Sequence, residues 1–216
     1  MTVRLLLALF VLVTAAALAG PNSRAVLLRP INAEFDADQL EMAARTIERR
    51  LVSAGMTAGV HVKVDPGAGI FVEMRGLEPA EQERVLELAR PRGLVEFRLV
   101  IPLRGDPISL DDLAPAALSG TVSGAEVHVT ELPVGPTVYL HIHEDHQAAF
   151  GALTGENIGE RLAIVMDGQI LTAPQLQAQI MGSAQISGFA SLEEAIRIAA
   201  LLDTDALPFD LEVVER

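Results

Sequence analysis

The sequence has no cysteine and few aromatic residues. The absence of cysteine excludes disulfide bonds, a thiolate metal site and lipid attachment through an N-terminal cysteine. Aromatic residues make up 4% of the 216 residues, whereas hydrophobic residues make up 50%. We therefore expect a globular protein whose core is built from leucine, valine, isoleucine and alanine.

The common catalytic signatures are also missing. The sequence contains no Walker loop, no Gly-x-Ser-x-Gly nucleophile elbow, no His-Glu-x-x-His motif and no dinucleotide-binding glycine fingerprint. We therefore expect a non-enzymatic protein with no catalytic residues and no cofactor.

Acidic residues are spread unevenly along a chain whose formal net charge is −13. Residues 20–104 carry equal numbers of acidic and basic side chains, whereas residues 105–204 carry 13 acids against Arg161 and Arg197. This step predicts a domain boundary near residue 104. An acidic module repels phosphate backbones, so we expect no nucleic-acid partner, and its acids are typical of an exposed, soluble module.

Residues 1–19 have the pattern of a signal peptide. A short basic start, Met1 to Arg4, precedes an apolar run, Leu5 to Leu18, and Ala17-Leu-Ala19 matches a small-residue cleavage site. The run is shorter than the roughly 20 residues that span a bilayer. We expect a cleaved signal peptide, with a retained N-terminal anchor as the alternative. Either way, the rest of the chain is expected to be periplasmic or otherwise extracytoplasmic.

The first half alternates predicted strands and helices. We expect strands over 25–28, 60–64, 70–74 and 94–100, and helices over 36–54 and 79–90. This β-α-β-β-α-β order is that of a ferredoxin-like unit, and we expect the terminal strand, 211–214, to join the same sheet. Arg45, Arg49 and Arg50 alternate with glutamates on the first helix, which predicts a solvated helix face.

The second half predicts an irregular entry followed by mixed strands and helices. We expect paired strands over 125–130 and 137–143, a helix over 145–154, and a further strand over 180–187. Asp167-Gly168 between apolar runs predicts a type I′ hairpin over 161–172. Ser191 and Glu194 form a capping box for a helix to Leu202. The apolar residues expected to pack this helix onto a sheet are Leu192, Ala195, Ile196, Ala199 and Leu202.

Three histidines form the one group that resembles a metal site. His141 and His143 lie two apart on a predicted strand and therefore share a face, and His146 follows at the turn. Three imidazoles could bind zinc. The opposite face of the strand carries valine, leucine and isoleucine, however, which favours an ordinary solvent-exposed face for the histidines. We retain His141, His143 and His146 as weak metal candidates only.

Several short blocks, in order and in spacing, resemble the large periplasmic domain of SecD, a subunit of the bacterial Sec protein-export machinery. The matching blocks are Gly159, RLAIV at 161–165, Asp167-Gly168, Ala173-Pro174, SAQISG at 183–188, LEEA at 192–195, ALP at 206–208 and LEVV at 211–214. Weaker matches are IERR at 47–50 with Gly55, and VEFRLV at 95–100. The resemblance covers residues 35–216.

The resemblance implies an α+β protein made of a ferredoxin-like base with an inserted α+β head. We expect the base at 20–104, the head at 105–204 and a returning base strand at 205–216. Two features differ from SecD: 22–30 lacks its Gly-Leu-Asp-Leu motif, and Asp205 replaces a usual glycine. SecD also continues into further membrane spans whereas this sequence ends at Arg216, so we expect no proton pathway in this chain.

The function implied is the handling of polypeptide during Sec-dependent translocation. The expected partners are unfolded or translocating polypeptide and the Sec channel or SecF-like membrane components. An exposed strand edge or an apolar groove of the head would bind an extended chain. The alternative is a periplasmic protein that uses the same fold to bind a metal or small ligand at His141 and His143.

Overall fold

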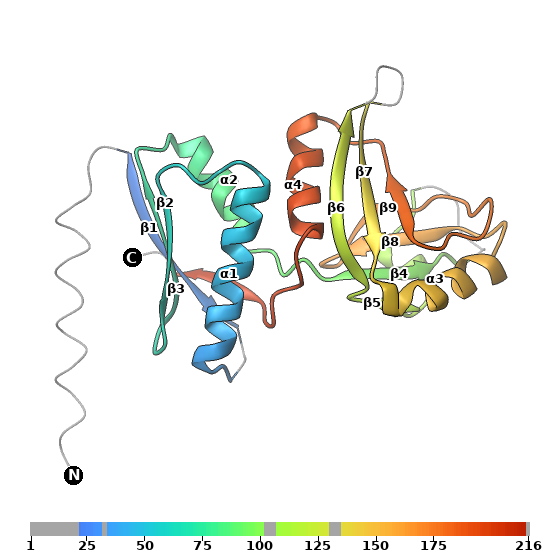
Figure 1. Ribbon diagram of the computed structural model, residues 1–216, viewed down its shortest axis with the longest axis horizontal. Coiled ribbons are helices and arrows are strands. Elements are labelled where there is room, and N and C mark those ends of the chain that lie inside the picture. Colours follow the sequence, from blue (N-terminus) through green and yellow to red (C-terminus); the bar gives the residue numbers. More distant parts are fainter. Residues whose placement is uncertain (1–21, 32–33, 102–106, 130–134, 215–216) are drawn as a thin grey trace, which may run out of the picture.

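The computed structural model describes residues 22–31, 34–101, 107–129 and 135–214 (Figure 1). The predicted signal peptide lies outside these residues. The helices are α1 (Ala37–Ser53), α2 (Pro79–Ala89), a short 3-10 helix η1 (Leu110–Asp112), α3 (Glu144–Glu156) and α4 (Leu192–Leu202). The strands are β1 (Ser23–Pro30), β2 (Val60–Asp65), β3 (Gly69–Arg75), β4 (Val95–Leu99), β5 (Leu118–Ser119), β6 (Val122–Val129), β7 (Pro136–Ile142), β8 (Leu162–Met166), β9 (Gln169–Thr172), β10 (Ser183–Ile186) and β11 (Leu211–Val214). The predicted α+β class is confirmed.

The first sheet has the strand order β11-β1-β3-β2, and all its neighbouring strands are antiparallel. With α1 and α2 between its strands, this is the ferredoxin-like order β-α-β-β-α-β. The last strand of the chain pairs with the first, Leu27 opposite Val214, as expected for 211–214. Helix α1 buries Leu40, Ile47 and neighbouring residues, and Asp36 caps its start by accepting a hydrogen bond from the Gln39 N–H.

The expectation that 94–100 belongs to the first sheet is wrong. Strand β4 pairs antiparallel with β8, Phe97 opposite Ile164, and with the short β5, so it lies in a separate sheet of order β5-β4-β8-β9. The local pattern of alternating apolar residues predicts that this segment forms a strand, but it does not predict which strand it pairs with. The place next to β1 goes to β11 instead. The proposed boundaries at 104 and 204 remain a prediction.

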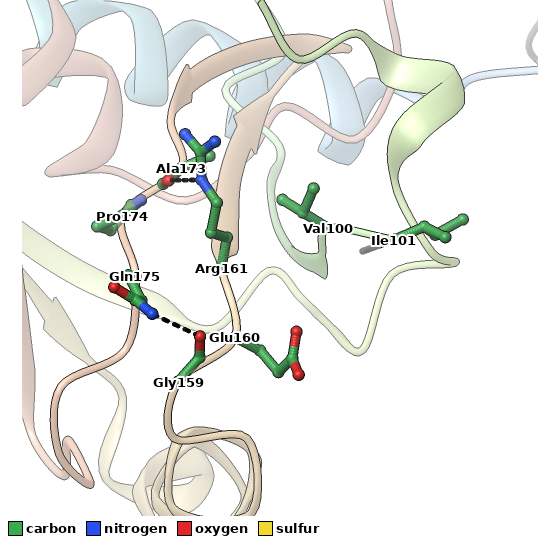
Figure 2. Close-up of a pocket in the computed structure, with 8 residues that line it drawn as sticks. All are labelled: Val100, Ile101, Gly159, Glu160, Arg161, Ala173, Pro174 and Gln175. Atoms are coloured by element: carbon green, nitrogen blue, oxygen red, sulfur yellow. Dashed lines mark hydrogen bonds between the residues drawn. The ribbon is translucent and has the colours of Figure 1, made fainter. Parts of the chain in front are cut away.

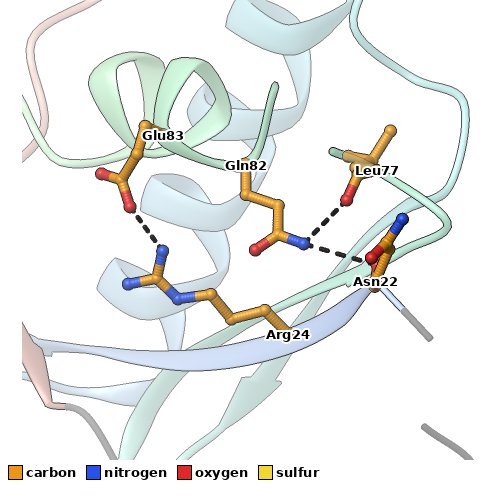
Figure 3. Close-up of polar contacts among 5 residues, drawn as sticks. All are labelled: Asn22, Arg24, Leu77, Gln82 and Glu83. Atoms are coloured by element: carbon orange, nitrogen blue, oxygen red, sulfur yellow. Dashed lines mark hydrogen bonds and ion pairs between the residues drawn. The ribbon is translucent and has the colours of Figure 1, made fainter. Parts of the chain in front are cut away.

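Polar contacts fasten the start of β1 to the start of α2 (Figure 3). The Gln82 side-chain amide donates to the carbonyl oxygens of Leu77, at 2.9 Å, and Asn22, at 3.4 Å. Arg24 reaches Glu83 of α2 at 2.5 Å. Gln82 is buried, so these carbonyls give its amide the partners that water cannot. The edge of the helix layer is thereby held to the first sheet.

Helix α4 lies between α1 and α2 on one side and a second sheet, of order β10-β7-β6, on the other (Figure 1). Because both sides are covered, its buried residues surround much of the helix: Ala195, Ile198, Ala199, Ala200, Leu201 and Leu202. The prediction that Leu192 and Ile196 pack on the sheet is wrong. Leu192 is 45% exposed, and both residues line a hollow beside α2.

The Asp-Gly hairpin is confirmed. Asp167 and Gly168 have φ values of 50° and 77°, the positive pair that a type I′ turn requires, and they join β8 to β9. The cap of α4 is partly as predicted. Ser191 Oγ accepts from the Glu194 N–H at 3.1 Å, whereas the Glu194 carboxylate accepts from the Ala190 N–H. Among the described residues, no helix is both long and apolar enough to cross a membrane.

Candidate functional site

A surface hollow of about 550 Å³ lies where β4 ends, before β8 begins and after β9 (Figure 2). Two side chains build its walls. Arg161 Nε donates to the Ala173 carbonyl at 2.9 Å, and Gln175 Nε2 donates to the Gly159 carbonyl at 2.8 Å. Figure 2 shows the Glu160 side chain turned away from the Arg161 guanidinium. The eight lining residues are Val100, Ile101, Gly159, Glu160, Arg161, Ala173, Pro174 and Gln175. We call this the head pocket.

Backbone pairing fixes the shape of the head pocket. The Val100 N–H donates to the Arg161 carbonyl at 2.9 Å, and the Leu162 N–H donates to the Pro174 carbonyl at 3.0 Å. Polar and apolar side chains line it together, and Ile101 is 43% exposed. An open hollow of this kind can hold a short segment of polypeptide, and its volume is within the range of ligand pockets, roughly 300–1,000 Å³.

The structure separates the three candidate histidines. His141 lies on the exposed face of β7, and its Nε2 is 3.1 Å from Glu126 Oε1 on β6. His143 lies past the end of β7, where its Nδ1 accepts from the Asp145 N–H at 3.3 Å and caps α3. The rings of His143 and His146 are 6.0 Å apart. Within the described ranges, no three His, Asp or Glu side chains are placed to hold a metal ion.

Glu126 is the residue near His141 that the sequence did not suggest. It lies between two imidazoles, because His128 Nε2 is 3.4 Å from its other oxygen. The hydrogen bond with His141 is the largest cause that lowers the pKa of the Glu126 carboxyl below its ordinary value. Glu126 and His141 come from facing strands about 15 positions apart in sequence, so no local spacing could join them.

Arg50 joins the segments that connect the first sheet to the rest of the chain. It is fully buried on α1, which contradicts the solvated face predicted for it. Its guanidinium donates to the carbonyls of Leu88, Pro91 and Arg92 and to the Thr204 hydroxyl, at 2.6 to 3.4 Å. We call this set the Arg50 junction. Burial lowers the pKa of Arg50 to about 10, and Asp167 acts in the opposite direction.

The chain leaves the first sheet and its helices for the other two sheets at 88–94, and it returns at 203–207. Both segments meet at the Arg50 junction. The Asp167 carboxylate accepts from the N–H groups of Gly93 and Leu94 at 2.8 Å each. Gly93 has a φ of 76°, and a Cβ there would come within 2.5 Å of an Arg50 nitrogen. Asp167 therefore has a structural role beyond its turn: it fixes one of these segments to the hairpin.

Residues 100–209 match the family model described as the SecDF P1 head subdomain. This match covers half of the chain, including every residue of the head pocket. The chain belongs to the SecDF P1 head family. From here on, the head means residues 100–209.

Relatives and solved structures are similar beyond the head. The protein translocase subunit SecDF of Thermus thermophilus is 32% identical over 203 residues, which are 82% of this chain and 28% of that protein. SecD of Acidaminococcus fermentans is 32% identical over 84% of this chain and 40% of its own length. This chain therefore spans well under half the length of these relatives.

A structure of SecDF, described as a membrane component that enhances protein export, is similar with a TM-score of 0.75. It is 31% identical and covers 89% of this chain and 99% of that one. A second structure, SecDF in a super-membrane-facing form, has a TM-score of 0.76 over 88% of this chain. The resemblance found in the sequence is thus confirmed for the fold.

Sequence reasoning left the binding residues of the head unassigned. Gly159, Arg161 and Ala173-Pro174, which line the head pocket, do belong to the blocks that mark the resemblance. They are far apart in sequence, and a pocket appears only after β4, which was assigned to another sheet, pairs with β8. The matching blocks contain pocket residues, but the pocket itself forms only through pairing between strands that are distant in sequence.

Proposed function

We propose that this protein is an extracytoplasmic, non-enzymatic module that binds unfolded polypeptide in Sec-dependent protein translocation, with no proton pathway of its own. The observation that carries the proposal is the head pocket, a surface hollow lined by polar and apolar residues that match the SecDF P1 head. The relatives named as translocase subunits support the same context. The Sec channel or SecF-like membrane components are the proposed partners.

The pocket suits a segment of polypeptide, because polar and apolar side chains line it together. Val100 and Ile101 would contact apolar side chains of the segment, and the backbone N–H groups of Val100 and Leu162 are already paired, so binding would make little demand for a specific sequence. Each residue of an extended chain spans about 3.3–3.6 Å, so a few residues could lie across the pocket. Such tolerance is what a module that meets many different polypeptides needs.

Binding of a reduced and carbamidomethylated polypeptide that cannot refold tests the proposal. We expect Ile101→Asp to weaken its binding about tenfold, equivalent to about 1.4 kcal/mol, because it places a charge where an exposed apolar side chain lines the pocket. Val52→Asp, which changes an exposed apolar residue of α1 outside the pocket, is the matched control and should leave binding within about twofold. Fluorescence anisotropy measures both, and equal effects of the two substitutions would contradict the proposed site.

A further inference from the structure

The outer strands of the three sheets differ in how they are protected. An unpaired strand edge attracts other strands, and proteins guard it with lysine, proline, charge or short length. Strand β2 carries Lys63, the only lysine of the chain, paired with Glu73. Strand β11 has four residues, and its Glu212 pairs with Arg29 of β1. Strands β5, β9 and β10 have two to four residues each.

Strand β6 has less of this protection, which is limited to Glu126, in contact with His141 of β7, and a register shift between Val122 and Gly124. It has eight residues, Val122–Val129, without lysine, arginine or proline, and its hydrogen-bonded neighbour in the sheet is β7 alone. Among the described residues, no backbone hydrogen bond leads from its outer edge to another segment. Asp203, just after α4, lies beside the face of β6 at Gly124. This is the longest outer strand of the described sheets.

The hydrogen bonds of β7 show which groups of β6 point outward. The Ile142 N–H donates to the Gly182 carbonyl on the β10 side, whereas the His143 N–H donates to the Thr121 carbonyl on the β6 side. Because these directions alternate along an antiparallel strand, His141 and Tyr139 point toward β6. Their partners Gly124 and Glu126 therefore point inward, which leaves the backbone N–H and C=O groups of Ala125 and Val127 on the outer edge.

We propose that the outer edge of β6 binds an extended segment of unfolded polypeptide as an added strand, a second contact beside the head pocket. This inference rests on the proposed function. A row of alternating backbone donors and acceptors is complementary to another extended backbone, and it recognises every sequence except at proline. Side chains do not obstruct it, since those of Ala125 and Val127 are half-buried and that of Glu126 is turned to the exposed face.

The two contacts would bind polypeptide through different chemical groups. The head pocket, at the end of the third sheet, offers polar and apolar side chains, whereas the β6 edge, in the second sheet, offers backbone groups. A polypeptide that spans both gains affinity from the second contact through effective concentration. Neither contact requires a particular sequence motif in the bound chain.

Proline substitution tests the edge without breaking the sheet. Ala125→Pro removes one outward N–H, and the bonds from β6 to β7 at Gly124 and Glu126 are kept. Ala125→Val, which keeps the N–H, is the matched control. A photoreactive residue at Glu126 reports the edge, one at Gln175 reports the head pocket, and one at His61 on the exposed face of β2 gives the background. The probe is the same unfolded, carbamidomethylated polypeptide.

We expect adducts at positions 126 and 175 above the background at 61, with Ala125→Pro lowering the adduct at 126 about tenfold and leaving that at 175 within about twofold. Adducts at 175 alone would overturn the edge proposal and leave the proposed function intact. Adducts at neither position would overturn the proposed function itself. If Ala125→Pro failed to fold, as seen by circular dichroism, the comparison of 126 with 61 in the otherwise unchanged protein would still decide.

Discussion

The first sheet and the second sheet are both small, antiparallel and covered on one face by helices, yet their edges differ. The first sheet places the chain's only lysine on β2 and pairs the charges of β11 with its neighbour. The second sheet ends in β6, which is longer and has no lysine, arginine or proline, although its Glu126 contacts His141 of β7. The charge follows the same division, since residues 20–104 are balanced and residues 105–204 are strongly acidic.

The difference suggests that the edges of the first sheet resist pairing with another strand, whereas the β6 edge of the second sheet accepts an added strand. Guarding an edge costs little in stability, since exposed ion pairs such as Lys63–Glu73 contribute about 1 kcal/mol or less. The absence of lysine, arginine and proline from β6 is therefore informative about use, because stability alone does not explain it. Each prediction below tests this difference between the two sheets.

The largest effect is expected at the Arg50 junction, which holds the two parts together. Arg50→Met removes the guanidinium donor from the carbonyls of Leu88 and Pro91, and it leaves the Arg92 carbonyl with the Leu207 N–H alone. We expect a loss of about 3 kcal/mol in the free energy of unfolding, measured by urea denaturation. Arg49→Met is the control, because Arg49 is exposed and donates one bond to the Asp203 carbonyl at 3.3 Å. It should cost about 0.5 kcal/mol or less. Equal losses would show that the junction does not join the two parts.

An intermediate effect is expected from removing the guard of the first sheet. Lys63→Val should make β2 resemble β6, because neither outer strand would then carry lysine or arginine. We expect concentration-dependent self-association, or adducts of unfolded polypeptide at His61 several-fold above those of the unchanged protein. Light scattering and crosslinking measure these. Lys63→Arg keeps the charge and should behave like the original protein. If Lys63→Val did the same, lysine would not be what distinguishes the two edges.

The smallest effect concerns a matched pair of carboxylates, Glu73 on the first sheet and Glu126 on the second. The hydrogen bond from Lys63 is the largest cause lowering the pKa of Glu73, and the one with His141 is the largest lowering the pKa of Glu126. Lys63→Ala should therefore raise the first pKa and His141→Ala the second, each toward its ordinary value, as carbon-detected NMR titration would show.

The sign of the pH effect is the same for both carboxylates. Each folded pKa lies below the unfolded value, so the stabilisation is complete above the unfolded pKa and is lost as pH falls through the folded pKa. The effect on overall stability is small because Glu126 is exposed and the Lys63–Glu73 pair lies at the surface. If the Glu126 pKa did not move in His141→Ala, the strand-face contact would not be what lowers it.

Local chemistry predicted the local elements of this fold. Asp167-Gly168 specified its hairpin, and Ser191 specified the start of α4, because turns and caps depend on a few adjacent residues. Pairing between distant segments was harder. Strand β4 was placed in the wrong sheet, since its alternation suits any half-buried strand and chain order does not choose the partner.

The site was less predictable than the fold. Arg50 looked like one member of a surface strip because arginine is usually exposed, and its burial depends on oxygen atoms that the two distant connecting segments supply. The head pocket and the β6 edge both arise from strand pairing, so no single stretch of sequence contains them. The histidines, by contrast, stood out in sequence and turned out to serve a strand-face contact and a helix cap.

Hydrogen exchange at the backbone amides of β6 tests the central claim most directly. The amides of Ala125 and Val127 point outward on β6. Those of Val62 and Val64 do so on β2, because the Arg75 N–H of β3 donates to the Gly59 carbonyl and alternate residues follow. All four should exchange fast in the free protein. We predict that unfolded polypeptide slows exchange at Ala125 and Val127 and leaves Val62 and Val64 unchanged. Equal exchange at Ala125 and Val127 with and without polypeptide would contradict the claim.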